Sequence, residues 1–205
     1  MDNRTAVATL LDRNSPLTEV AAHLDALDHA TRLEQCRALG RTAQRVLFNL
    51  ASADQVRLED LVPASVAPRT EVIQFGMNTL PLPGAMRRFE KRFCRPDDGS
   101  ARLFGFNEGS TRALIGPGYF VAVPTAGNEQ WQQRGAVVVD YYQVPDGPVV
   151  EGWPKVVPNS SGLQRFVFQG TRDFMRRVSD WVTIGAAYKG EKALDHYFVL
   201  VRNPG

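Results

Sequence analysis

The spacing of the hydrophobic residues changes once along this chain. Over residues 16–51 apolar side chains recur every three or four positions, whereas over residues 71–202 short apolar runs alternate with turn residues. The first spacing is typical of a helix with one buried face, and the second is typical of antiparallel strands. Because the helices come in one block and the strands in another, the sequence predicts an α+β fold rather than alternating βα units.

Three short amphipathic helices are predicted in the first block, over residues 16–27, 29–39 and 41–51. Ser15 and Pro16 suit the start of the first helix, Asp28 can cap the second, and Gly40 suits the end of the second. Residues 1–14 have no clear period and are expected to fray. We therefore expect residues 1–62 to form a helical region.

The second block contains about nine short segments with strand character. Residues 171–178 fit either period, and the shared helical face of Phe174, Val178 and Trp181 favours a short helix there. Turns are predicted at residues 96–99 and 189–191, and Gly116-Pro117-Gly118 is expected to close a hairpin. The predicted strands cover residues 71–75, 86–95, 102–106, 113–115, 119–123, 135–144, 164–169, 181–188 and 195–202.

Many short antiparallel strands must hide their edges, and closing the sheet is the usual way to do so. We therefore expect residues 63–205 to form an antiparallel barrel or a strongly curved sheet. The helical region is expected to pack on that sheet, since three short helices cannot build a large core alone.

The charge balance and the cysteines limit the partners and the compartment. The chain has 24 basic and 22 acidic residues, which gives no global argument for nucleic acid or a membrane surface as a partner. No apolar window reaches the roughly 20 residues of a membrane span, and the N-terminus lacks the pattern of a signal peptide. Cys36 and Cys94 are expected to be free thiols, as in a bacterial cytoplasm.

Motifs for metal, nucleotide or nucleophilic chemistry are missing from the sequence. The three histidines, His23, His29 and His196, have no ligand spacing, and neither cysteine lies in a Cys-x-x-Cys pair. No glycine-rich phosphate motif and no Gly-x-Ser-x-Gly elbow occurs. The sequence therefore predicts neither a metal site nor a cofactor.

The most basic run of the chain lies in the predicted strand over residues 86–95. Alternation puts Phe89, Lys91 and Phe93 on one face, which the phenylalanines mark as facing the core or a partner, with Lys91 the exception to explain. A basic strand with aromatic residues can contact RNA. The alternative, an arginine-rich outer face beside acidic neighbours, is favoured because the whole chain is nearly neutral.

Polar residues interrupt the apolar strands at several positions and mark a candidate pocket. A polar group inside a barrel must be paired or must contact a ligand, because burying it alone costs roughly 1–3 kcal/mol. We expect a cavity reached from the end that carries Asn107 and Arg112, with Arg112 or a neighbouring arginine on the acidic head of an apolar or amphipathic ligand. The candidate residues are Asn107, Arg112, Tyr119, Asp140, Tyr142 and His196.

Three functions are compatible with this pattern. The first is a barrel that binds a small apolar or amphipathic acid. The second is an enzyme that uses the same pocket, with Asp140, Tyr142 or His196 as acid or base and Arg112 stabilising an anion. The third is an interaction module with a filled barrel, whose helices dock a partner. For the pocket residues themselves, the alternative is that Asp140 and an arginine form a structural ion pair with the tyrosines packed around it.

Overall fold

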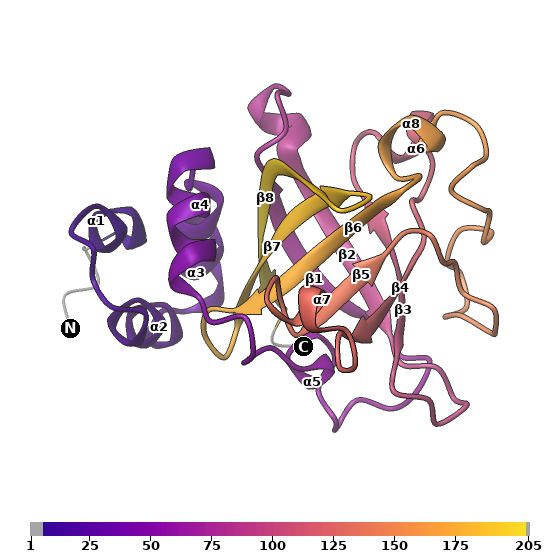
Figure 1. The fold of residues 1–205 in the computed structure, drawn as a ribbon, viewed down its shortest axis with the longest axis horizontal. Coiled ribbons are helices and arrows are strands. Elements are labelled where there is room, and N and C mark those ends of the chain that lie inside the picture. The colour runs from indigo at the N-terminus through magenta and orange to yellow at the C-terminus, as the bar shows by residue number, and fades with distance from the viewer. Residues whose placement is uncertain (1–5, 204–205) are drawn as a thin grey trace.

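A closed antiparallel barrel forms the centre of the molecule in the computed structural model, which describes residues 6–203 (Figure 1). Each strand pairs with the next one along the chain, and the last strand pairs with the first. The α+β fold with an antiparallel barrel is therefore confirmed. The eight strands are β1 (Val72–Asn78), β2 (Arg88–Cys94), β3 (Leu103–Glu108), β4 (Phe120–Pro124), β5 (Val137–Asp140), β6 (Thr171–Arg177), β7 (Val182–Lys189) and β8 (Lys192–Arg202).

Four N-terminal helices cover one outer side of the barrel (Figure 1). They are α1 (Val7–Asp12), α2 (Leu17–Ala26), α3 (His29–Arg37) and α4 (Arg41–Leu50), and the last three confirm the predicted helices. Their apolar faces share a core with the outward side chains of β1, β7 and β8, where Leu24 and Leu47 are completely buried. The prediction that residues 1–14 fray was wrong for residues 7–12, which form helix α1 because Val7, Leu10 and Leu11 pack into the same core. Residues 1–5 lie outside the described part of the chain.

One end of the barrel is filled. The short helix α5 (Leu58–Leu61) lies across this end (Figure 1), and Leu61 and Val62 pack against the inward side chains of the barrel. The Gln74 amide donates to the Leu61 carbonyl at 2.9 Å, and the Arg95 guanidinium donates to the carbonyls of Val62, Pro63 and Val66. The β2–β3, β4–β5 and β6–β7 connections also belong to this end, with α7 (Glu129–Gln132) in the second of them.

The other four connections meet at the opposite end, because consecutive connections of an up-and-down barrel alternate between its ends. The β1–β2 connection contains the 3₁₀ turn η1 (Gly84–Arg87), the β3–β4 connection contains α6 (Arg112–Ile115) and the β5–β6 connection contains α8 (Gln164–Val167). Helices α6 and α8 lie next to each other in Figure 1. The β7–β8 hairpin completes this end, which we call the mouth.

The long β5–β6 connection also wraps the outside of the barrel. Val149, Val150 and Trp153 pack on the outward side chains of Cys94, Phe104 and Val121. Strands β2, β3 and β4 are therefore covered on both faces here, so they lack the alternation of polar and apolar residues that a half-exposed strand shows. Cys36 and Cys94 are free and buried, as expected. Within residues 6–203, no helix combines the length and the apolar character that crossing a membrane requires.

Several local predictions of secondary structure were wrong. The expected strands over residues 113–115 and 164–169 are the helical turns α6 and α8, and residues 171–177 form strand β6 instead of a helix. The expected hairpin at Gly116-Pro117-Gly118 is therefore a helix-to-strand connection, in which both glycines have positive φ. In β6, Phe174 and Met175 are both buried, on opposite faces of the strand, so its period of two is not visible in the sequence. The turns at residues 96–99 and 189–191 are confirmed as hairpin connections.

Candidate functional site

A cavity of about 480 Å³ opens at the mouth and extends into the barrel. This volume lies within the range of roughly 300–1,000 Å³ that is typical of small-molecule sites. Its walls are mainly apolar and aromatic, with Phe89, Phe168 and Phe198 among them. The barrel is thus filled at the α5 end and hollow at the mouth.

Four polar side chains meet at the inner end of the cavity, and we call them the floor: Lys91, Asn107, Tyr141 and Asp173. The Lys91 Nζ lies 3.1 Å from Asp173 Oδ2 and 3.1 Å from Asn107 Oδ1, and it also contacts the Tyr141 hydroxyl. The Tyr141 hydroxyl lies 3.2 Å from Asp173 Oδ2. Lys91, Tyr141 and Asp173 are almost completely buried, so the floor is a compact polar network inside an apolar barrel.

Aromatic rings surround the ammonium group of Lys91. Its Nζ lies 4.8 Å from the centroid of the Phe120 ring, 4.9 Å from that of Phe198 and 5.9 Å from that of Phe89, with Tyr141 at 5.0 Å. Ring faces within about 6 Å attract a cation through the ring quadrupole. The floor therefore combines one carboxylate with an aromatic cage around a single nitrogen atom.

Glycines on the neighbouring strands make room for these three phenylalanines. Gly76 pairs with Phe89, Gly105 with Phe120 and Gly185 with Phe198 across the strands. A Cβ atom on Gly185 would lie only 2.2 Å from the Phe198 ring, and one on Gly76 only 2.5 Å from the Phe89 ring. The rings lie against backbone that has no side chain, which brings them close to Lys91.

Burial sets the electrostatics of the floor. Burial lowers the pKa of Lys91, and the neighbouring Asp173 opposes that change. Burial likewise raises the pKa of Asp173, against the effect of Lys91. The pKa of Tyr141 is raised far above its usual value by burial and then by Asp173. Both partners of the ion pair are thus shifted toward their neutral forms, which eases proton transfer between them.

The mouth carries more positive than negative charge and several exposed apolar side chains. Arg88, Arg112 and Lys189 line it, and Glu108 is the one acidic side chain among its described lining residues. Glu108 accepts from Arg112 Nε at 2.7 Å. The exposed apolar side chains here are Leu82, Met86, Phe166 and Val167.

Three of the six residues predicted for the pocket line the cavity. Asn107 belongs to the floor, where its amide also donates to the Gly118 carbonyl at 2.9 Å. Arg112 lies at the mouth on α6, half-exposed and paired with Glu108. His196 lines the wall on β8, and burial followed by the charge of Arg41 lowers its pKa.

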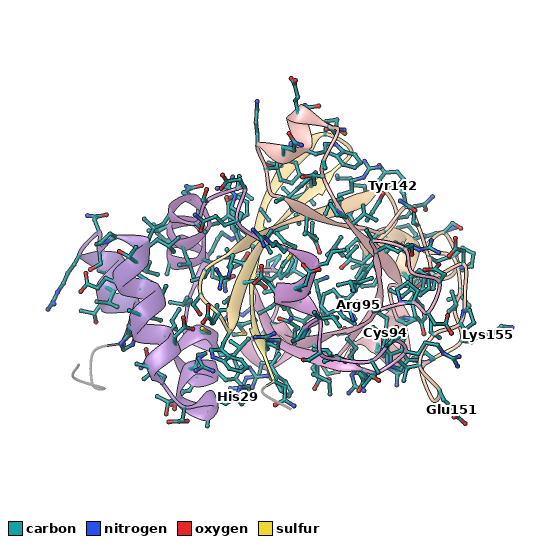
Figure 2. The ribbon with its side chains drawn as sticks, turned by 90° about the horizontal axis from the view of Figure 1, so that it is seen from below. His29, Cys94, Arg95, Tyr142, Glu151 and Lys155 are labelled. Carbon is teal, nitrogen blue, oxygen red and sulfur yellow. The ribbon has the colours of Figure 1, made fainter. Side chains whose placement is uncertain are left out.

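The other three lie outside the barrel. The Tyr119 hydroxyl donates to the Pro154 carbonyl, with Phe106 and Trp153 packed on its ring. Asp140 faces outward and lies 3.3 Å from Arg172, which is the structural ion pair considered above. Tyr142 is exposed and donates to the Gly170 carbonyl at 3.1 Å (Figure 2).

Sequence reasoning missed three floor residues: Lys91, Tyr141 and Asp173. Lys91 interrupts an apolar strand face, and this interruption is the sequence signal that points to a polar group inside the barrel. Val137–Asp140 is buried on both faces, so alternation could not show that Tyr141, rather than Asp140 and Tyr142, faces inward. Asp173 lies in the segment that was assigned to a helix.

The fold and the site together define a closed eight-stranded antiparallel barrel with a cavity at one end. Comparison with protein-family models, with curated proteins and with solved structures finds no significant match for this chain. Within residues 6–203, histidine, cysteine, aspartate and glutamate side chains form no group of three that would hold a metal ion. The function is therefore inferred from the chemistry of the cavity itself.

Proposed function

We propose that this protein binds a small, mainly apolar molecule with an acidic group, in the cavity at the mouth of the barrel. The observation that carries this proposal is the apolar, aromatic cavity with a few converging polar groups, the usual composition of a small-molecule site. The two ends of the barrel differ in a way that supports it. Side chains fill the α5 end, whereas the mouth is hollow.

The charges indicate how the ligand lies. Lys91 and Asp173 neutralise each other, and a ligand carboxylate placed at the floor would meet the carboxylate of Asp173. At the mouth, Arg88, Arg112 and Lys189 outnumber Glu108. We therefore place the acidic group of the ligand at the mouth and its apolar part along Phe89, Phe168 and Phe198.

A displacement experiment tests this orientation. The probe is the fluorescent fatty acid cis-parinaric acid, and the variant is Arg112→Met. A charge-assisted hydrogen bond contributes about 1.5–3 kcal/mol when it is buried, and exposure reduces this to about 1 kcal/mol here. We expect a several-fold weaker affinity for the probe and an unchanged fold.

The matched control is Arg102→Met. Arg102 also pairs with carboxylates, those of Asp98 and Asp146, but it lies at the α5 end of the barrel. Its replacement should leave the affinity unchanged. Equal losses in both variants, or no binding of the probe by the wild-type protein, would contradict the proposal.

An enzyme that uses the same cavity is the second candidate, and the floor favours it. Buried groups with shifted pKa values in a pocket are typical of catalytic sites. Because Asp140 and Tyr142 lie outside the barrel, acid–base chemistry in the cavity would fall to the floor residues and His196. The interaction module gains less support, since it requires a filled barrel and apolar residues exposed on the helices. On the described helices α1–α4, Val46 is the single large apolar residue that is exposed, so these helices have no exposed apolar stripe.

The proposed setting is the cytoplasm. Both cysteines are free, and burial raises the pKa of Cys36 to about 12 and that of Cys94 to about 11. Such thiols are poor nucleophiles at neutral pH and suit a reducing compartment. Thiol titration without reductant should give both groups after unfolding and neither quickly before it. A recovered disulfide would contradict this setting.

A further inference from the structure

We infer that Lys91 is a nucleophilic amine, and that the cavity takes an aldehyde or ketone whose carbonyl carbon bonds to Lys91 Nζ as an imine. The inference rests on the proposed binding of a small apolar molecule. It adds the reactive group that this molecule carries and the protein atom to which it becomes attached.

The first observation is that residue 91 is a lysine in a chain that otherwise uses arginine for its buried cations. The chain has four lysines, and all other basic residues apart from the histidines are arginines. Lys91 is buried, whereas Lys155, Lys189 and Lys192 are exposed. Every other ion pair among the described residues uses an arginine.

The use of lysine instead of arginine indicates a reactive amine rather than a structural ion pair. Arginine is the usual residue for a buried ion pair, because its planar group makes several hydrogen bonds at once. Its guanidinium stays protonated and forms no imine, whereas a desolvated lysine amine is a nucleophile. The one buried ion pair that uses lysine is the one at the floor of the cavity.

The neighbours of Lys91 can move the protons that imine formation requires. Asp173 Oδ2 lies 3.1 Å from Nζ and can accept a proton from the ammonium group, which frees the nitrogen lone pair. Burial, which lowers the pKa of Lys91 and raises that of Asp173, favours this transfer. The Tyr141 hydroxyl contacts both groups and can pass the proton between them.

The reaction is balanced without any further reactant. The lone pair of Nζ attacks the carbonyl carbon, and a proton moves from the nitrogen to the oxygen to give a carbinolamine. The proton held by Asp173 then moves to the carbinolamine hydroxyl, which leaves as water while the C=N bond forms. The products are a protonated imine on Lys91, an Asp173 carboxylate and one water molecule, so the total charge is unchanged.

The floor suits the product as well as the free lysine. A protonated imine keeps a positive nitrogen at the position of Nζ, where the Asp173 carboxylate and the rings of Phe120 and Phe198 stabilise a cation. The chain of the bound molecule then extends along the apolar wall toward the mouth. An aldehyde with an apolar chain therefore fits both the floor and the wall.

Reductive trapping tests the inference. The full-length protein is incubated with nonanal and sodium cyanoborohydride, which reduces the protonated imine to a stable secondary amine and leaves the free aldehyde largely intact. The labelled residue is then located by peptide mass spectrometry. Lys91 is expected to carry one nonyl group, with labelling on the order of ten-fold or more above that of each exposed lysine, because the bound aldehyde is held next to Nζ.

Two variants make the result specific. Lys91→Arg keeps the positive charge and should lose the label. The double variant Lys155→Arg, Lys192→Arg replaces two exposed lysines that do not line the cavity and should keep the label on Lys91 in full. Lys155 lies at the outer edge of the β5–β6 connection in Figure 2, so its replacement does not disturb the cavity.

Non-covalent binding separates the failure of this inference from the failure of the proposed function. Nonan-1-ol lacks a carbonyl group and should displace cis-parinaric acid from the wild-type protein. Displacement by nonan-1-ol without labelling of Lys91 by nonanal would overturn the imine and leave the binding function standing. Equal labelling of all four lysines would also overturn it. If neither the alcohol nor the fatty acid binds, both proposals fail.

Discussion

Lys91 Nζ and Asp173 Oδ2 lie 3.1 Å apart inside the barrel, and both side chains are almost completely buried. The two residues are 82 positions apart in the chain and belong to β2 and β6. A buried ion pair is expensive to desolvate, and an apolar pair of similar size is often at least as stable. The Lys91–Asp173 pair at the end of a cavity is therefore better explained by a reaction with a bound molecule than by a contribution to the stability of the fold.

The first prediction concerns the loss of one partner. Lys91→Met leaves Asp173 buried with Tyr141 as its remaining donor, and breaking a buried pair in this way costs about 3–5 kcal/mol. The double variant Lys91→Met, Asp173→Leu removes both charges and should recover most of that loss. Urea unfolding of the wild type and the three variants of the cycle measures the coupling. Additive single losses would show that the two groups do not interact.

The second prediction concerns the pH dependence of Lys91→Met. Burial already raises the pKa of Asp173, and removal of the Lys91 cation, which opposes that shift, should raise it further. A carboxyl group whose pKa is higher in the folded than in the unfolded state stabilises the fold most at low pH. Its contribution is lost as the pH rises from the unfolded pKa of about 4 through the folded value.

Urea unfolding of Lys91→Met between pH 4 and 8 checks this sign. The free energy of unfolding of Lys91→Met should fall further below that of the wild type as the pH rises, and the difference should then level off. The variant Lys91→Met, Asp173→Leu serves as the control, since it lacks the titrating carboxyl group. A deficit that shrinks with increasing pH would contradict the assigned direction.

The third prediction concerns the rings that surround Lys91. Gly185→Ala places a Cβ atom 2.2 Å from the Phe198 ring, so the ring must move toward the cavity. Overpacking of this kind costs about 1–3 kcal/mol and should also weaken ligand binding. Gly147→Ala is the matched control, because its Cβ would lie 3.7 Å from the nearest ring atom, an ordinary contact. Equal stability of the two variants in thermal unfolding would refute the close approach.

The fourth prediction separates a helical block that is part of the core from one that serves a partner. Leu47 is completely buried between α4 and the barrel, and Leu47→Ala should cost about 2–5 kcal/mol. Val46, the adjacent residue, is 38% exposed, and Val46→Ala should change the stability little. A small effect of Leu47→Ala together with loss of a binding partner would instead support the interaction module.

The sequence predicted the architecture because the hydrophobic period is a local property. The helices over residues 16–51 and most strands follow from spacing alone, and the closed barrel follows from the number of strands. The errors occur where both faces of a strand are covered, as in β5 and β6, since the sequence then shows no alternation. They also occur in α6 and α8, turns of four residues that are too short for a period.

The candidate site was predictable only in part, for a related reason. The cavity could be located from one continuous stretch of sequence, which contains Asn107 of the floor and Arg112 of the mouth. The floor joins Lys91 of β2, Asn107 of β3 and Asp173 of β6 with Tyr141, which directly follows β5. These side chains meet only once the register and the inward face of each strand are known. Both faces of β5 are buried, so the sequence does not show which face points into the barrel. The prediction took the face of Asp140 and Tyr142, whereas Tyr141 faces inward.

Binding of a small apolar acid at the hollow end of the barrel requires that the cavity stay open, so a cavity-filling variant should abolish it. Ala187 lines the cavity, whereas Ala193 is exposed on the neighbouring strand. The measurement is a fluorescence titration with cis-parinaric acid of the wild type, Ala187→Trp and Ala193→Trp. Saturable binding of the probe by the wild type and by Ala193→Trp, with loss of at least about ten-fold in affinity for Ala187→Trp, is the expected result. Equal affinities in all three proteins, or no saturable binding by the wild type, would show that the cavity does not bind a small apolar acid.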